Sequence, residues 1–177
     1  IGLDVPVAVV EPEAAAAAFA ASLPVVPLGL PVTAEPGRPD ESSAPAAIAA
    51  IRRAVADVVH GRARALVTNP VAKAVLYRNG FTDPGHTEYL ARLAAELLGA
   101  AEPHPVMMLW APELAVVPVT VHVALRDVPR QLTRDLIVET GRIVARDLKL
   151  RFRIARPRLV AAGLNPHAGE DGALGPE

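Results

Sequence analysis

Residues 159–170 read LVAAGLNPHAGE, and the fold expected for the whole chain follows from this stretch. The apolar run Leu159–Ala162 predicts a buried strand that ends at Gly163. Asn165-Pro166 then predicts a turn, because proline fixes its own φ and disfavours helix in the residue before it. His167 is therefore expected just beyond the C-terminal end of a strand, where open α/β sheets bind ligands. This histidine is a candidate metal ligand or acid/base, and the alternative is a loop histidine bonded to backbone groups.

Strands and helices alternate along the rest of the chain. Apolar runs predict strands at residues 5–10, 23–28, 65–68, 106–110 and 114–120. Alanine content and apolar residues at helical spacing predict helices at residues 14–21, 44–60, 71–78, 88–98 and 129–149. The link 111–113 is short enough for a hairpin. The pattern indicates the α/β class, with a mostly parallel sheet and flanking helices.

Small polar residues and glycines mark the expected helix ends. Ser42 or Ser43 is expected to cap the helix at 44–60, and Asp127 the helix at 129–149. Gly61 and Gly99 follow helices in the position where a left-handed residue ends them. These signals predict the helix bounds from local chemistry alone.

Composition excludes several classes of function. Hydrophobic residues make up 51% of the 177 residues, which argues against disorder. The net charge of −1 and the 3% aromatic content argue against a nucleic-acid-binding protein, which needs positive charge and aromatic side chains for base stacking. Cysteine is absent, which excludes disulfides and thiolate metal sites and is compatible with a cytoplasmic location. No apolar run approaches the roughly 20 residues that span a bilayer, so no membrane partner is expected.

Both ends of the sequence are unusual for a complete protein. The chain opens at Ile1 without a methionine, and it stops at Glu177 directly after the loop that carries His167. We therefore expect a piece of a longer chain.

Two histidines are each placed just beyond a predicted strand. His122 follows the strand at 114–120, and His167 follows Leu159–Ala162. If those strands are neighbours, the two imidazoles can bind one cation. Neutral imidazole suits zinc, cobalt, nickel or iron, whereas a site that also holds carboxylates and water can take magnesium or manganese. Spacing alone leaves a shared metal and two separate loop histidines both open.

A second group of candidates lies before the helix at 88–98. His86 and Thr87 belong to the sequence PGHTE at residues 84–88, and Thr87 can cap the helix. The free N–H groups at that helix start can receive a phosphate or a carboxylate. Lys73, in the first turn of the helix at 71–78, is either a surface lysine or a weak candidate for anion contact or proton transfer. No glycine-rich nucleotide fingerprint appears, so no cofactor-binding residue is assigned.

Four sequence blocks together resemble one known family. They are TNPVAK at 68–73, PGHTEYLA at 84–91, TVHVALRDV at 120–128 and GLNPHAGE at 163–170. In this order they closely resemble the 4-hydroxythreonine-4-phosphate dehydrogenase family of vitamin B6 biosynthesis. The resemblance covers most of the chain from about Gly37 onward, and it departs at Val121, where a threonine is expected.

The resemblance implies a fold and a set of site residues. The fold is that of isocitrate dehydrogenase, with two α/β domains around a cleft and a homodimer with shared active sites. Residues 1–68 would belong to the first domain, and residues 69–177 would form the second. The family holds a divalent cation (zinc, magnesium or cobalt) with three histidines; His122 and His167 match two of them, and the third lies beyond Glu177. His86 and Thr87 match residues that bind the phosphorylated substrate.

The implied reaction is the NAD- or NADP-dependent oxidation of 4-phosphohydroxy-L-threonine. The product, 2-amino-3-oxo-4-phosphooxybutyrate, then loses carbon dioxide to give 3-amino-2-oxopropyl phosphate in pyridoxal phosphate biosynthesis. Three alternatives stay open. They are a related dehydrogenase of another phosphorylated hydroxy acid (phosphothreonate type), a metal-dependent hydrolase, and a non-catalytic α/β remnant.

Overall fold

The chain divides into two compact units. The computed structural model describes residues 4–167 and 169–173. One unit extends to Pro105, and the other begins at Val106. This division lies later in the chain than the domain boundary predicted between residues 68 and 69, which stays a prediction for the domains of the longer protein.

The first unit opens with a small parallel sheet. It contains β1 (Val7–Val9), the 3-10 helix η1 (Pro12–Ala14), α1 (Ala15–Ala18) and β2 (Leu23–Val25). β1 pairs with β2 in parallel, with Val7 opposite Leu23 and Val9 opposite Val25. Both strands were predicted, and both are shorter than the apolar runs that contain them.

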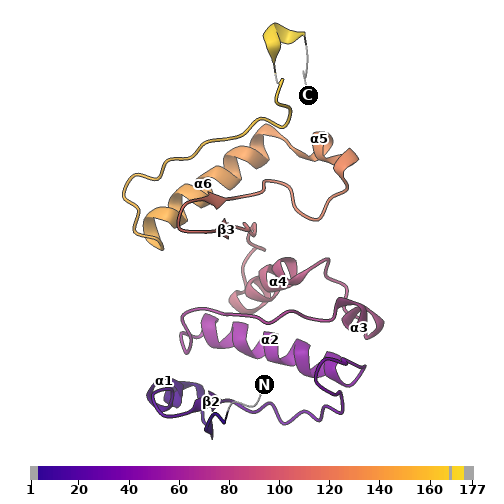
Figure 1. The fold of residues 1–177 in the computed structure, drawn as a ribbon, viewed down its shortest axis with the longest axis vertical. Coiled ribbons are helices and arrows are strands. Elements are labelled where there is room, and N and C mark those ends of the chain that lie inside the picture. The colour runs from indigo at the N-terminus through magenta and orange to yellow at the C-terminus, as the bar shows by residue number, and fades with distance from the viewer. Residues whose placement is uncertain (1–3, 168, 174–177) are drawn as a thin grey trace. The chain divides into compact units, whose positions relative to one another are not determined.

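Three helices follow, and two of them carry most of the packing. They are α2 (Ser43–Val59), α3 (Lys73–Arg78) and α4 (His86–Leu98), and α4 packs against α2 (Figure 1). Gly61 and Gly99 have φ of 75° and 59°, the left-handed conformation that a side chain disfavours. The predicted helix ends at these glycines are confirmed. Ser42 is at the N-cap of α2, but its hydroxyl bonds to Asp40 and Thr33 and does not cap the helix.

The core of the first unit lies between α2 and α4. Ile51 and Val55 are one helical turn apart on α2, and Tyr89 and Leu93 are one turn apart on α4. Leu93 is completely buried. A second cluster joins the start of α2 to α3 through Ala44, Val75 and Leu76, and half-buried Phe81 packs against both clusters. The segment before α4 is therefore anchored in the core.

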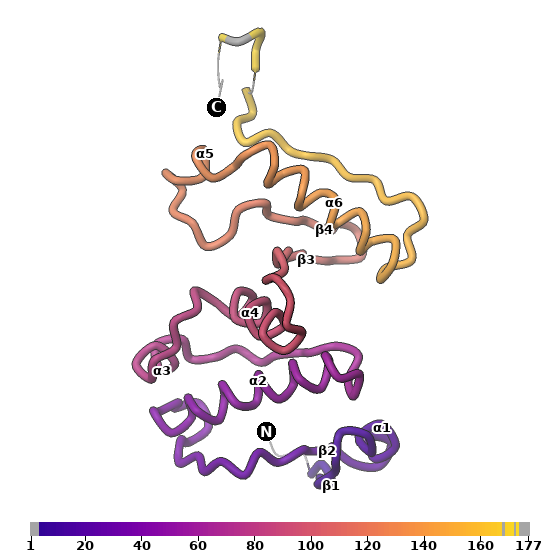
Figure 2. The backbone as a smooth tube through the Cα atoms, turned by 180° about the vertical axis from the view of Figure 1, so that it is seen from behind, coloured from indigo at the N-terminus to yellow at the C-terminus, as the bar shows by residue number. Residues whose placement is uncertain are grey.

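The second unit contains a hairpin and one long helix. Its elements are β3 (Leu109–Trp110), β4 (Ala115–Val116), η2 (Leu125–Asp127), α5 (Val128–Gln131), α6 (Arg134–Leu150) and η3 (Glu170–Gly172). β3 and β4 are antiparallel, so the predicted hairpin is confirmed. α6 buries Thr140 and Val144. The extended chain after α6 runs back alongside the helix in both views (Figures 1 and 2).

The predicted helix at 129–149 is two helices. α5 ends at Gln131, and α6 begins at Arg134 after an extended Thr133. The Thr133 hydroxyl accepts a hydrogen bond from the backbone N–H of Leu136 at 3.2 Å, which is the normal geometry of an N-cap. The expected cap, Asp127, lies before α5 and instead accepts a hydrogen bond from Arg130. Among the described residues, no helix combines the length and the apolar character needed to cross a membrane.

Two predicted strands do not form. Residues 65–68 and 159–162 are extended but belong to no ladder, and Val67 and Val160 are 94% and 91% exposed. A strand needs a neighbour to bond its N–H and C=O groups, and no described residue supplies one here. The α/β class is confirmed, but the described part of the sheet structure is one parallel pair and one hairpin.

Candidate functional site

His86 and Thr87 begin α4. The residue before them, Gly85, is extended with φ of −162°, and no side chain caps the helix. The prediction that Thr87 caps α4 was wrong, because the helix already begins at His86 and Thr87 is its second residue. The first N–H groups of an α-helix have no partner within the helix. They form a site for an anion beside these two side chains.

Buried polar atoms without partners mark the same helix start. Nε2 of His86 and Oε2 of Glu88 are buried, and neither has a hydrogen-bond partner among the described residues. A buried polar atom without a partner is destabilising by about 1–3 kcal/mol. His86 therefore keeps an unused hydrogen-bonding position, which another group can reach only if the side chain moves.

The loop before α4 is fixed by residues that sequence reasoning missed. Asp83 is 8% exposed, and its carboxylate accepts hydrogen bonds from Nε and Nη2 of Arg92 at 2.8 and 2.7 Å. These bonds hold the pKa of the Asp83 carboxyl below its usual value. The Tyr77 hydroxyl donates to the backbone carbonyl of Pro84 at 3.0 Å. No sequence signal identifies the Asp83–Arg92 pair, because nine residues separate a loop position from a helix position.

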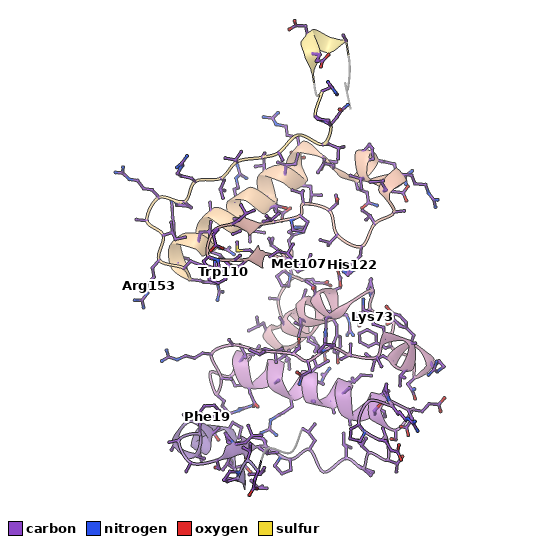
Figure 3. The ribbon with its side chains drawn as sticks, in the orientation of Figure 1. Phe19, Lys73, Met107, Trp110, His122 and Arg153 are labelled. Carbon is purple, nitrogen blue, oxygen red and sulfur yellow. The ribbon has the colours of Figure 1, made fainter. Side chains whose placement is uncertain are left out.

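Lys73 is the first residue of α3. It is exposed (Figure 3), and none of the described acidic side chains forms an ion pair with it. The positive end of a helix disfavours a lysine there, so nothing local holds the ammonium group in place. Its possible role in anion contact or proton transfer stays a prediction.

His122 lies on the loop that leads from β4 to η2 (Figure 3). It is exposed, and its φ is 58°, a conformation that residues other than glycine rarely adopt. Such backbone strain is more frequent at ligand sites than elsewhere. The predicted place just beyond a strand was wrong, because β4 ends at Val116 and His122 follows six residues later.

His167 is held by two local contacts. Its backbone N–H donates to Oδ1 of Asn165 at 2.9 Å, and Nδ1 of its ring lies 2.7 Å from Oε1 of Glu170. An ionised carboxylate can only accept, so Nδ1 is the donor in this contact, and in the neutral imidazole the lone pair is then on Nε2. That is the usual arrangement of a metal-binding histidine with an orienting carboxylate.

The η2–α5 segment and the chain before His167 meet at a depression, which is lined by Leu125, Val128, Pro129, Leu164 and Asn165. His122 lies three residues before Leu125, and His167 lies two residues after Asn165. Within residues 4–167 and 169–173, no group of three or more His, Asp or Glu side chains could hold a metal ion. Each imidazole suits a cation, but their common site stays a prediction.

The whole described chain matches one protein family. The family model described as pyridoxal phosphate biosynthetic protein PdxA matches residues 3–177. The chain belongs to this family. Two curated 4-hydroxythreonine-4-phosphate dehydrogenases show the degree of similarity. The one from Bradyrhizobium diazoefficiens is 64% identical over all 177 residues, and the one from Xanthobacter autotrophicus is 58% identical over the same length.

Solved structures of the PdxA family agree with this assignment. The 4-hydroxythreonine-4-phosphate dehydrogenase of Burkholderia phymatum superposes with a TM-score of 0.75 at 32% identity, over 99% of this chain and 51% of its own. The enzyme of the same name from Klebsiella pneumoniae superposes with a TM-score of 0.74 at 31% identity, over 95% of this chain and 50% of its own. The chain therefore spans about half the length of the relatives that it matches.

Proposed function

We propose that the full-length protein oxidises 4-phosphohydroxy-L-threonine with NAD or NADP in pyridoxal phosphate biosynthesis. The reaction moves a hydride from the carbon that bears the hydroxyl to the nicotinamide and releases the hydroxyl proton. The 2-amino-3-oxo-4-phosphooxybutyrate formed then loses carbon dioxide and gives 3-amino-2-oxopropyl phosphate. The observation that carries this proposal is the match over the entire chain to relatives that bear this enzyme's name.

The start of α4 would bind the polar end of the substrate. The Nε2 of His86 is buried and has no partner among the described residues, and a movement of this side chain would offer it to a substrate oxygen. Thr87 adds a hydroxyl, and the first N–H groups of α4 favour a negatively charged group. Together these groups would orient the substrate and shield it from bulk water on this side.

His122 and His167 would hold the divalent cation. Glu170 would orient the imidazole of His167 through Nδ1, so that Nε2 is the nitrogen offered to the cation. When bound, zinc, magnesium or cobalt supplies a Lewis acid that stabilises negative charge on the substrate oxygens during oxidation and decarboxylation. Two imidazoles need at least one further donor, which the longer protein would have to provide.

The family resemblance supports two further parts of this proposal. A homodimer with shared active sites would supply donors from outside this chain, and a cytoplasmic location agrees with the absence of cysteine.

The test uses the full-length protein with a divalent cation. Addition of 4-phosphohydroxy-L-threonine and NAD or NADP should produce the reduced nicotinamide, measured by its absorbance, together with one carbon dioxide for each hydride transferred. Release of inorganic phosphate without nicotinamide reduction would replace the proposal by a hydrolase. Preferential turnover of a phosphorylated threonate would change the substrate assignment but keep the dehydrogenase reaction.

A further inference from the structure

An ion pair joins α4 to the loop in front of it, with the Asp83 side chain 9% exposed and the Arg92 side chain 47% exposed. Asp83 lies in that loop, two residues before Gly85, and Arg92 lies within α4. Both carboxylate oxygens of Asp83 accept hydrogen bonds from the guanidinium group, at 2.8 and 2.7 Å. Two parallel bonds of this kind fix orientation as well as distance.

Aromatic side chains hold the pair from the other side. The guanidinium carbon of Arg92 lies 5.2 Å from the ring centroid of Tyr89, within the range of a cation–π contact. Tyr89 is buried, and its ring meets Phe81 edge-on at 5.0 Å between centroids. Phe81 belongs to the same loop as Asp83. The arginine is therefore fixed between the core and the loop.

Besides this pair, the loop before α4 is held by the Tyr77 hydroxyl, which donates to the carbonyl of Pro84 at 3.0 Å, and by the packing of Phe81, but the helix start itself has no side-chain cap. Gly85 precedes the helix without a side-chain cap, and glycine has the widest conformational freedom of all residues. The first helical residue, His86, has no described partner on its buried Nε2. The direction of His86 and Thr87 therefore depends on how the preceding loop is held.

We propose that the Asp83–Arg92 pair is the positioning device for His86 and Thr87. It holds the loop before α4 so that the two side chains meet the substrate in one orientation. This inference rests on the proposed function, because it assigns the positioning role to the substrate site of that enzyme. Asp83 and Arg92 do not touch the substrate and act only through the loop and the helix start.

The same helix offers a matched control. Arg52 of α2 pairs with Glu96 near the C-terminal end of α4, and both side chains are about half exposed. This second pair links α4 to α2 but does not contact the loop before α4. Removing it changes a charge on the same helix and leaves the start of the helix intact.

The test compares Arg92→Met, Arg92→Lys and Glu96→Gln in the full-length protein. Methionine keeps much of the apolar stem, and lysine keeps the charge but loses the bidentate geometry. A displacement of about 1 Å at a substrate-positioning group can lower kcat/KM ~100-fold. We expect Arg92→Met to raise KM for 4-phosphohydroxy-L-threonine by about ten- to a hundredfold with kcat little changed. The KM of Arg92→Lys should lie between those of Arg92→Met and the unsubstituted protein. The KM of Glu96→Gln should equal that of the unsubstituted protein.

Hydrogen exchange gives a second measurement that does not depend on turnover. Amides of residues 81–88 should exchange faster in Arg92→Met and unchanged in Glu96→Gln, while residues 51–55 stay protected in both. A lower melting temperature with normal KM and unchanged exchange at residues 81–88 would overturn the proposal and make the pair only stabilising. If the unsubstituted protein shows no dehydrogenase activity, the proposed function fails, and the exchange result alone decides whether the pair orders His86 and Thr87.

Discussion

Replacement of Leu93 by alanine tests the packing of α2 against α4. Leu93 has 0% of its surface exposed and lies among Ile51, Val55 and Tyr89. The change removes the equivalent of about three methylene groups, each worth about 0.8 kcal/mol, or ~2.4 kcal/mol in transfer free energy. The cavity left behind adds to this, because helices held on both sides relax only partly. We expect a total loss of about 3–4 kcal/mol in the free energy of unfolding, within the range of ~2–5 kcal/mol for such changes.

Urea unfolding of the full-length protein, followed by far-ultraviolet circular dichroism, measures this loss. Leu98→Ala is the control, because it makes the same substitution at the last residue of the same helix, where the side chain is 62% exposed. We expect the control to change stability by no more than about 0.5 kcal/mol. Equal losses of unfolding free energy in the two variants would refute the packing argument. So would a loss below about 1 kcal/mol in Leu93→Ala, provided that the dependence of the unfolding free energy on urea concentration is unchanged.

Three further predictions concern the candidate site. Glu170→Ala, which removes the carboxylate that orients His167, should weaken binding of a divalent cation by ~10–100-fold. His122→Ala and His167→Ala should each weaken it by at least as much. If calorimetry finds unchanged cation affinity in both histidine variants, the ligand assignment is wrong. His86→Ala should raise KM for the substrate without changing the melting temperature, whereas a normal KM with a collapsed melting temperature would make His86 structural. The pKa of Asp83 is lowered in the folded state, so its stabilising contribution is present above the unfolded value of about 4 and is lost as the pH falls through the lower folded value. The urea midpoints of the unsubstituted protein and Asp83→Asn should therefore converge in acid, and a constant difference would contradict this assignment.

Helices were predictable because their signals are local. The bounds of α2 and α4 differ from the predicted 44–60 and 88–98 by at most two residues at either end. Apolar residues one turn apart set the buried faces, and Gly61 and Gly99 supply the left-handed ends. The split between α5 and α6 was missed, although Thr133 is a good capping residue, because apolar residues at helical spacing continue across it.

Strands were less predictable because pairing is a property of two segments. Residues 65–68 and 159–162 have the apolar character of buried strands, yet in the described part of the chain neither finds a partner. Val67 and Val160 therefore remain exposed although their sequence context favours burial. By contrast, β3 and β4 are linked closely enough for the hairpin to follow from the sequence.

The candidate site divides into a part that the chain organises by itself and a part that it does not. The loop before α4 is fixed by the Tyr77 hydroxyl, the Asp83–Arg92 pair and the packing of Phe81, all within one unit. His122, by contrast, lies on an exposed loop, and His167 is held only by its near neighbours Asn165 and Glu170. Preorganised groups bind without a large entropy loss, whereas groups on loosely held segments must be ordered when the ligand binds. The start of α4, the proposed substrate-binding end, should therefore keep its geometry without a cation, while the two imidazoles proposed as metal ligands should take fixed positions only when the cation and its remaining donors are present.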